Sequence, residues 1–197
     1  MAEISIDNFD SYLESRGYDL IKRLDHSRIV NIVIRNIGVP TVIKRDIAKD
    51  NMFPQTLVEN KILEKFRGLD RLPKKIRFKN NLIKNSKKSF SIGKTMLEDY
   101  FLEEEYIKGE IYNCQQLSTA EEQKIIDLMK TFHKEGYSRL DFKRSNNFIF
   151  TPKNELYYID SGWCINKDNP EFKEELKEDL RHLEKLLKKS VSAQGVI

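Results

Sequence analysis

Hydrophobic positions in the first third of the chain follow patterns that are typical of β-strands. Residues 18–24 are followed by the polar turn 25–28, and residues 29–34 form a β-branched run. A turn over residues 36–40 then leads into residues 41–44. The pattern predicts three strands joined by turns, and two further strands are expected before residue 105.

Helical spacing of apolar residues begins after Pro54, where Thr56 is the expected N-cap and the helix is expected to end near Gly68. The same spacing recurs from Ser118 or Thr119 to Gly136, and again from Pro170 onward. Between these two helices, residues 148–150 and 156–159 predict a hairpin. A strand-rich first half and a helical second half indicate an α+β protein.

The composition agrees with a globular protein: 197 residues, 39% hydrophobic and 34% charged. No apolar run approaches the roughly 18 residues of a membrane-spanning helix, and no signal peptide is visible, so we expect a cytoplasmic protein. Cys114 and Cys164 lack metal-ligand spacing, and we expect neither zinc nor a disulfide framework. The net charge of +4 would suit phosphate-rich partners, but the Lys-rich composition explains it equally well.

A polar stretch after the second predicted helix has the most informative spacing. Asp141, Lys143 and Asn146 fit the pattern D-x-K-x-x-N. Such an aspartate can accept the proton of an attacking hydroxyl, the lysine can offset phosphoryl charge, and the asparagine can ligate magnesium. Polar loops of this kind are common, so the spacing alone leaves an ordinary solvated loop open.

The predicted hairpin ends in Ile159-Asp160-Ser161-Gly162, where the aspartate can be a second magnesium ligand. Helix, loop, hairpin and Asp-x-Gly in this order resemble the catalytic half of the protein kinase-like superfamily. Upstream, Lys44 resembles the V-A-I-K lysine that binds nucleotide phosphates. Its partner would be a helix glutamate.

Two glutamates compete for that role. Glu59 shares the apolar stripe of its helix, whereas Glu64 falls on the polar side, so Glu59 is the better candidate. Glu59 also fits a capping box with Thr56, which remains an alternative. Residues 102–109, with Glu105, resemble the hinge E-Y-I-x-G whose backbone faces adenine; an acidic strand end is the other interpretation.

The resemblance spans about residues 18–187 and implies a bilobal kinase-like fold. It implies a strand-rich N-lobe over residues 1–105, a truncated helical C-lobe over residues 106–190 and a tail over residues 191–197. His133-x-x-Gly136 and Ile159-Asp160-x-Gly162 are most similar to the lipopolysaccharide core (Kdo and heptose) kinases, and more distantly to RIO-type kinases. The implied cofactors are ATP and Mg²⁺. The implied site residues are Asp141 and Lys143 for catalysis, Lys44, Glu59 and Glu105 for nucleotide, and Asn146 and Asp160 for metal.

Some positions depart from the family pattern. The turn over residues 25–28 has no glycine, so phosphate would be bound there either by backbone amides or by Ser27 and Arg28. Arg139 stands where the family has a histidine, and Ser161 stands where it has a phenylalanine. Asp179, on the last predicted helix, either braces the catalytic loop or is a surface carboxylate. His133 is expected to be a packed structural residue.

The resemblance implies transfer of the γ-phosphate of ATP to a hydroxyl. Little sequence follows Gly162, where protein kinases dock peptides, and basic residues surround Asp141, so we expect an anionic sugar or glycolipid acceptor. Peripheral contact with the inner face of the membrane would be compatible with this acceptor. The alternatives are a RIO-like Ser/Thr protein kinase and a pseudokinase or non-catalytic binding module. No nucleic-acid partner is expected, because the lysines lack interleaved stacking residues.

Overall fold

The computed structural model describes residues 9–25, 29–35, 40–48, 54–83, 97–113 and 115–192. These residues form a mixed α/β protein with small antiparallel sheets and four α-helices, as expected for the α+β class. The chain divides into two compact units. Unit 1 comprises Met1–Asn60 and Lys74–Tyr106, and unit 2 comprises Lys61–Pro73 and Ile107–Ile197. Compared with the expected lobes, residues 61–73 belong to the second unit.

Unit 1 is built on a five-stranded antiparallel sheet in the order β1-β2-β3-β5-β4. The strands are β1 (Tyr18–Asp25), β2 (Ile29–Arg35), β3 (Thr41–Ala48), β4 (Lys75–Ile83) and β5 (Leu97–Glu105). The expected strand ending at Lys44 is therefore too short. Residues beyond it pair with β5, as in Arg45 with Phe101 and Ala48 with Glu98, so Lys44 lies within a strand.

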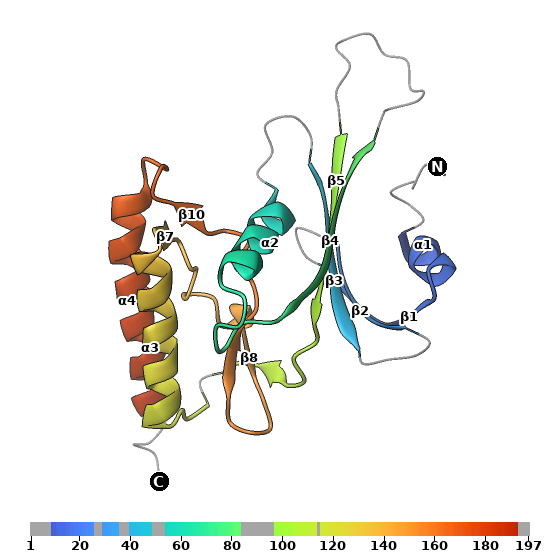
Figure 1. Ribbon diagram of the computed structural model, residues 1–197. Coiled ribbons are helices and arrows are strands. Elements are labelled where there is room, and N and C mark those ends of the chain that lie inside the picture. Colours follow the sequence, from blue (N-terminus) through green and yellow to red (C-terminus); the bar gives the residue numbers. More distant parts are fainter. Residues whose placement is uncertain are drawn as a thin grey trace. The chain divides into compact units, whose positions relative to one another are not determined.

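Helices lie on both faces of this sheet (Figure 1). A short helix that the sequence pattern did not predict, α1 (Phe9–Ser15), contributes Leu13 to a buried cluster with Tyr18, Ile43 and Phe101. Because successive residues of a strand face opposite sides, Lys44 faces away from this cluster. It contacts α2 (Gln55–Lys65) on the other side.

The start of α2 differs from the expected N-cap. Thr56 is already inside the helix, which begins at Gln55, directly after Pro54. Proline suits this position because its ring fixes φ at a helical value. The amide of Thr56 donates to Oδ2 of Asp46 at 2.5 Å, so a carboxylate from β3 caps the helix instead.

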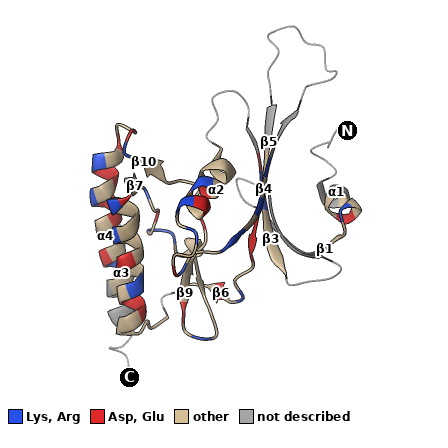
Figure 2. Ribbon diagram, viewed as in Figure 1, with Lys and Arg blue, Asp and Glu red and all other residues tan. Residues whose placement is uncertain are grey.

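Unit 2 contains two long helices, α3 (Thr119–Lys134) and α4 (Phe172–Ser192), which lie side by side (Figure 1). Ser118 is the N-cap of α3, and its Oγ accepts from the Glu121 amide. Acidic and basic residues are spread along both helices (Figure 2). Within the described residues, no helix combines the length and the apolar character that a membrane crossing requires.

Short strands complete unit 2. Its sheets have the orders β6-β8-β9 and β10-β7. The elements are β6 (Glu110–Ile111), β7 (Tyr137–Ser138), the 3₁₀ helix η2 (Ser145–Asn147), β8 (Phe148–Phe150), β9 (Leu156–Tyr158) and β10 (Ile165–Asn166). Aromatic rings form its core: Phe142, Phe148 and Tyr158 are in mutual ring contact, and Phe132 contacts Tyr158.

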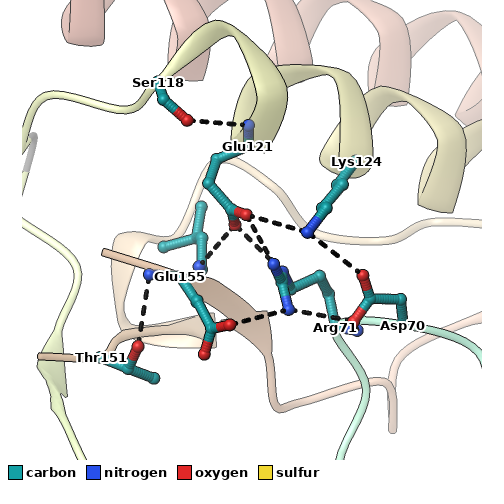
Figure 3. Close-up of polar contacts among 8 residues, drawn as sticks. Asp70, Arg71, Ser118, Glu121, Lys124, Thr151 and Glu155 are labelled. Carbon is teal, nitrogen blue, oxygen red and sulfur yellow. Dashed lines mark hydrogen bonds and ion pairs between the residues drawn. The ribbon is translucent and has the colours of Figure 1, made fainter. Parts of the chain in front are cut away.

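A buried ion network fixes the hairpin β8–β9 to α3 (Figure 3). Arg71 binds both carboxylate oxygens of Glu121, from Nε at 3.0 Å and from a terminal nitrogen at 2.5 Å. Glu121 also accepts from the amide of Leu156, and the carbonyl of Arg71 accepts from the amide of Tyr158. Burial raises the pKa of Glu121, but the hydrogen bonds from Arg71 and Leu156 outweigh it, so its pKa lies below the ordinary value.

Gly109, the glycine of the hinge-like motif, has a steric role. A Cβ at this position would lie 2.5 Å from the carbonyl oxygen of Phe150 and 2.7 Å from Cγ2 of Ile149. The backbone before β6 therefore passes β8 too closely for any side chain. Packing alone is a sufficient reason for this glycine.

Candidate functional site

In unit 1, the structure brings together Lys44 and Glu59, the pair expected from the sequence. The Lys44 ammonium lies 2.7 Å from Oε1 of Glu59 and 2.6 Å from Oε1 of Glu104. All three residues are buried, with 4%, 1% and 2% of their surface exposed. The Thr56 amide, to which Glu59 would bind in the capping box, donates to Asp46 instead.

Glu105 is the last residue of β5, which is the acidic strand end that the sequence left open. Its amide donates to the carbonyl of Lys74 at 2.8 Å, and its carboxylate accepts from the Lys74 amide at 3.2 Å. The amide N–H of Glu105 is therefore already used in a hydrogen bond to Lys74. Ser27 and Arg28, expected at the phosphates, lie outside the described residues.

The segment of unit 2 that contains the D-x-K-x-x-N pattern runs from β7 to η2. Arg139 and Asp141 both have positive φ values, 59° and 52°. Residues other than glycine rarely adopt this left-handed conformation, and such residues concentrate at functional sites. The backbone turns here so that the buried Asp141 is directed among charged residues from its own loop.

Two cations lie beside Asp141. Nε of Arg144 is 3.0 Å from Oδ2, and the ammonium of Lys143 is 3.8 Å from Oδ1. Burial nevertheless raises the pKa of Asp141 above the ordinary value: Arg144, Lys143 and Asn147 act in the opposite direction, and the charge of Asp160 adds to the rise. A carboxylate with a raised pKa is a stronger proton acceptor, as a general base requires.

Asp160 and Asn146 lie on neighbouring segments. The amide of Ile159 donates to the carbonyl of Asn147 at 2.9 Å, so the residues that flank this hydrogen bond are close in space. Asn146 is exposed in η2, whereas Asn147 is buried and donates to the carbonyl of Asp141 at 3.2 Å. The neighbouring asparagine thus holds the loop, which leaves Asn146 available to solvent.

These donors fit a magnesium ion. Among the described residues there is no group of three or more His, Cys, Asp or Glu that could hold a metal. Magnesium in phosphate-transfer sites is held by one or two carboxylates together with water and substrate phosphates, and does not need such a group. The repulsion between Asp160 and Asp141 is the kind of interaction that a cation relieves.

Helix α4 holds the backbone that precedes Asp141. Oδ1 of Asp179 accepts from the Leu140 amide at 2.8 Å, and its Oδ2 lies 3.0 Å from Nε2 of His133. Arg139 pairs with Glu171 and with Glu175, the latter at 2.9 Å. Asp179 is therefore a brace and not a surface carboxylate. The sequence predicted that Arg139, Lys143 and Arg144 all place positive charge around Asp141. That prediction is wrong for Arg139, whose charge is directed to α4.

No protein-family model matches the sequence, and no curated protein matches it. The functional interpretation therefore rests on the residues themselves.

Sequence reasoning missed two residues that contact the expected site, Glu104 and Asn147. Strand alternation could have found Glu104, since it shares a sheet face with Leu102, the partner of Lys44 across the β3–β5 pair. Nothing in the sequence distinguished Asn147 from Asn146, because the exposure of each depends on how η2 is turned.

Proposed function

We propose that this chain is an ATP-dependent phosphotransferase with a protein kinase-like fold, in which Asp141 is the catalytic base. The observation that carries the proposal is the environment of Asp141. It is buried, it has a left-handed backbone, two cations flank it, and the second expected metal ligand, Asp160, is close enough to raise its pKa. A solvated polar loop would need none of these features.

The sheet of unit 1 supports the same proposal. A five-stranded antiparallel sheet, with α2 between β3 and β4, fits the nucleotide-binding lobe that the resemblance implies. The Lys44–Glu59 pair would hold an ammonium for the phosphate oxygens of ATP. Unit 2 would be the reduced catalytic lobe.

In the proposed reaction, Asp141 accepts the proton of the acceptor hydroxyl while that oxygen attacks the γ-phosphorus and the bond to ADP breaks. Lys143 is exposed beside Asp141 and would offset the charge that develops on the phosphoryl oxygens. Asp160 and Asn146 would hold Mg²⁺, which supplies charge neutralisation on the phosphates.

We propose an anionic sugar or glycolipid as the acceptor. Lys143 and Arg144 are exposed next to the base and can bind an acidic group. The resemblance to lipopolysaccharide core kinases points to the same class.

A labelling competition tests the proposal. The protein is incubated with radiolabelled ATP, Mg²⁺, lipopolysaccharide core fragments and generic protein substrates, with Asp141→Asn as the control. We expect label on the core fragments only, and none with the control. Label on protein alone would instead favour a RIO-like Ser/Thr protein kinase. Binding of Mg-ATP without any transfer would favour a pseudokinase or binding module.

A further inference from the structure

The ammonium of Lys44 is shared by carboxylates from two different elements. Glu59 approaches from α2 at 2.7 Å, and Glu104 approaches from β5 at 2.6 Å. Charge-assisted hydrogen bonds of this length are the strong ones. A second carboxylate therefore offsets the positive charge on which the proposed function relies for binding phosphate.

The strand register explains why Glu104 reaches Lys44 whereas its neighbour does not. Lys44 pairs with Leu102 and Val42 pairs with Glu104, so Glu104 is the diagonal neighbour of Lys44 on one sheet face. Glu103 faces the opposite side, where it accepts from Tyr18 at 2.8 Å and binds Arg77 at 2.9 Å. Two successive buried glutamates thus serve different faces of one sheet.

The two partners of Lys44 are attached to the chain in different ways. Glu59 lies on a helix, which packs on the sheet through its side chains. Glu104 lies on β5, the strand directly hydrogen-bonded to β3, so its backbone and that of Lys44 belong to one framework. The Glu104 contact follows from the register of that strand pair. Glu104 also directly precedes Glu105, the first residue of the hinge-like motif.

We propose that Glu104 is a specificity-determining residue of the nucleotide site, and that it limits the affinity gained from each phosphate group. This inference rests on the proposed function, in which Lys44 binds phosphate oxygens. A buried carboxylate beside the same ammonium repels an incoming polyphosphate. Nucleotide affinity should therefore rise less steeply from adenosine to triphosphate than Lys44 alone would allow.

The test is calorimetric binding of adenosine, ADP and the non-hydrolysable analogue AMP-PNP, each with Mg²⁺, to the full chain. Glu104→Gln keeps the size of the side chain and removes its charge. We expect AMP-PNP affinity to rise about tenfold, because a unit charge a few ångströms away is worth at least that at protein dielectric. The affinity for ADP should rise less, and the affinity for adenosine should not change.

Glu103→Gln is the matched control, since it removes an equally buried carboxylate from the same strand but on the other face. Its ratio of AMP-PNP to adenosine affinity should equal that of the wild type. If Glu104→Gln does not fold, as judged by circular dichroism, Glu104→Met is measured instead, because Lys44 keeps the Glu59 carboxylate as its partner and is not left as an unpaired buried charge.

The outcomes separate the inference from the proposed function. Suppose that the wild type binds AMP-PNP and that the ratio of AMP-PNP affinity to adenosine affinity is unchanged or smaller in the Glu104 variant. The inference is then overturned and the proposed function stands. If no form of the protein binds adenosine or AMP-PNP, the proposed function fails and the inference fails with it. The inference is supported if the ratio of AMP-PNP affinity to adenosine affinity is larger than in the wild type for the Glu104 variant but not for Glu103→Gln.

Discussion

The amide of Leu140 donates to Oδ1 of Asp179 at 2.8 Å, across a separation of 39 residues in the sequence. The second oxygen of that carboxylate lies 3.0 Å from Nε2 of His133, so one buried side chain connects α3, α4 and the loop that carries Asp141. The left-handed φ of Asp141 follows directly after this anchor. In the proposed enzyme, Asp179 would therefore position the base, and this role can be separated from ATP binding.

Asp179→Ala should lower kcat while leaving nucleotide affinity within about twofold. The loss of the Leu140 contact lets the base drift, and misplacement by about an ångström can reduce a rate by about 10²-fold. Steady-state kinetics and calorimetric nucleotide binding measure the two effects. Glu178→Ala, on the same helix but bonded only within it to Arg181 and His182 in the described contacts, is the control. Equal kinetic losses in both variants would contradict the positioning role.

Replacing Asp141 should stabilise the fold while abolishing transfer. Because burial raises its pKa, the ionised form of Asp141 opposes folding, and this penalty grows as pH rises through the folded pKa. Asp141→Asn removes the penalty, so we expect a higher Tm than wild type at pH 7. The difference should vanish below about pH 3, well under the ordinary pKa of an aspartate, where the carboxyl is protonated in both states. Thermal denaturation across pH checks this; a lower Tm at pH 7 would mean that its cation contacts outweigh burial.

Glu121→Gln should destabilise the protein, because Arg71 would remain buried without its bidentate partner. The loss from breaking a buried pair is about 3–5 kcal/mol. The lowered pKa of Glu121 gives the sign of the pH effect: its contribution is present above the ordinary pKa and is lost as pH falls through the folded pKa. Urea denaturation measures the free energy of unfolding. Glu122→Gln, one residue along α3, should change it by less than about 0.5 kcal/mol.

Two glycine substitutions separate steric from conformational causes. Gly109→Ala places a methyl group against the β8 backbone, and overpacking of this kind destabilises by about 1–3 kcal/mol. Gly68→Ala meets no atom within 4 Å but must adopt a φ of 84°, a left-handed strain of about 1–2 kcal/mol. Protection of the β6 and β8 amides from hydrogen exchange should fall only in the first variant. The same loss in both would contradict the steric role.

The sequence predicted the elements whose pattern is local. The strands of unit 1, the helices α2, α3 and α4, and the β8–β9 hairpin all follow from the spacing of apolar residues. Predictions failed where residues distant in the sequence determine the start or the end of an element. The N-cap of α2 is Asp46 from β3, which a search around Thr56 could not find, and β3 continues past Lys44 because β5 pairs with it.

The candidate site shows the same division. Asp141 and Asp160 were identified by motif spacing, and the Lys44–Glu59 contact by helical periodicity. Neither method could show that Arg139 is directed to α4, because that depends on the left-handed turn of the loop and on Glu171 and Glu175 lying opposite it. Chemical roles follow from residue type, whereas partners follow from tertiary packing.

The electrostatic contact between Asp160 and Asp141 gives a test of the proposed metal site that does not depend on turnover. Burial is the main reason that the pKa of Asp141 is raised, and the negative charge of Asp160 raises it further. Asp160→Asn should therefore lower the pKa of Asp141, which carboxyl ¹³C NMR titration can follow. Mg²⁺ added to the wild type should act in the same direction, since a cation held by Asp160 favours the ionised form of its neighbour. Asp160→Asn should lose this response to Mg²⁺, whereas Asp168→Asn, in an exposed turn, should keep it. A pKa of Asp141 that responds to neither change would show that the two carboxylates do not form one site.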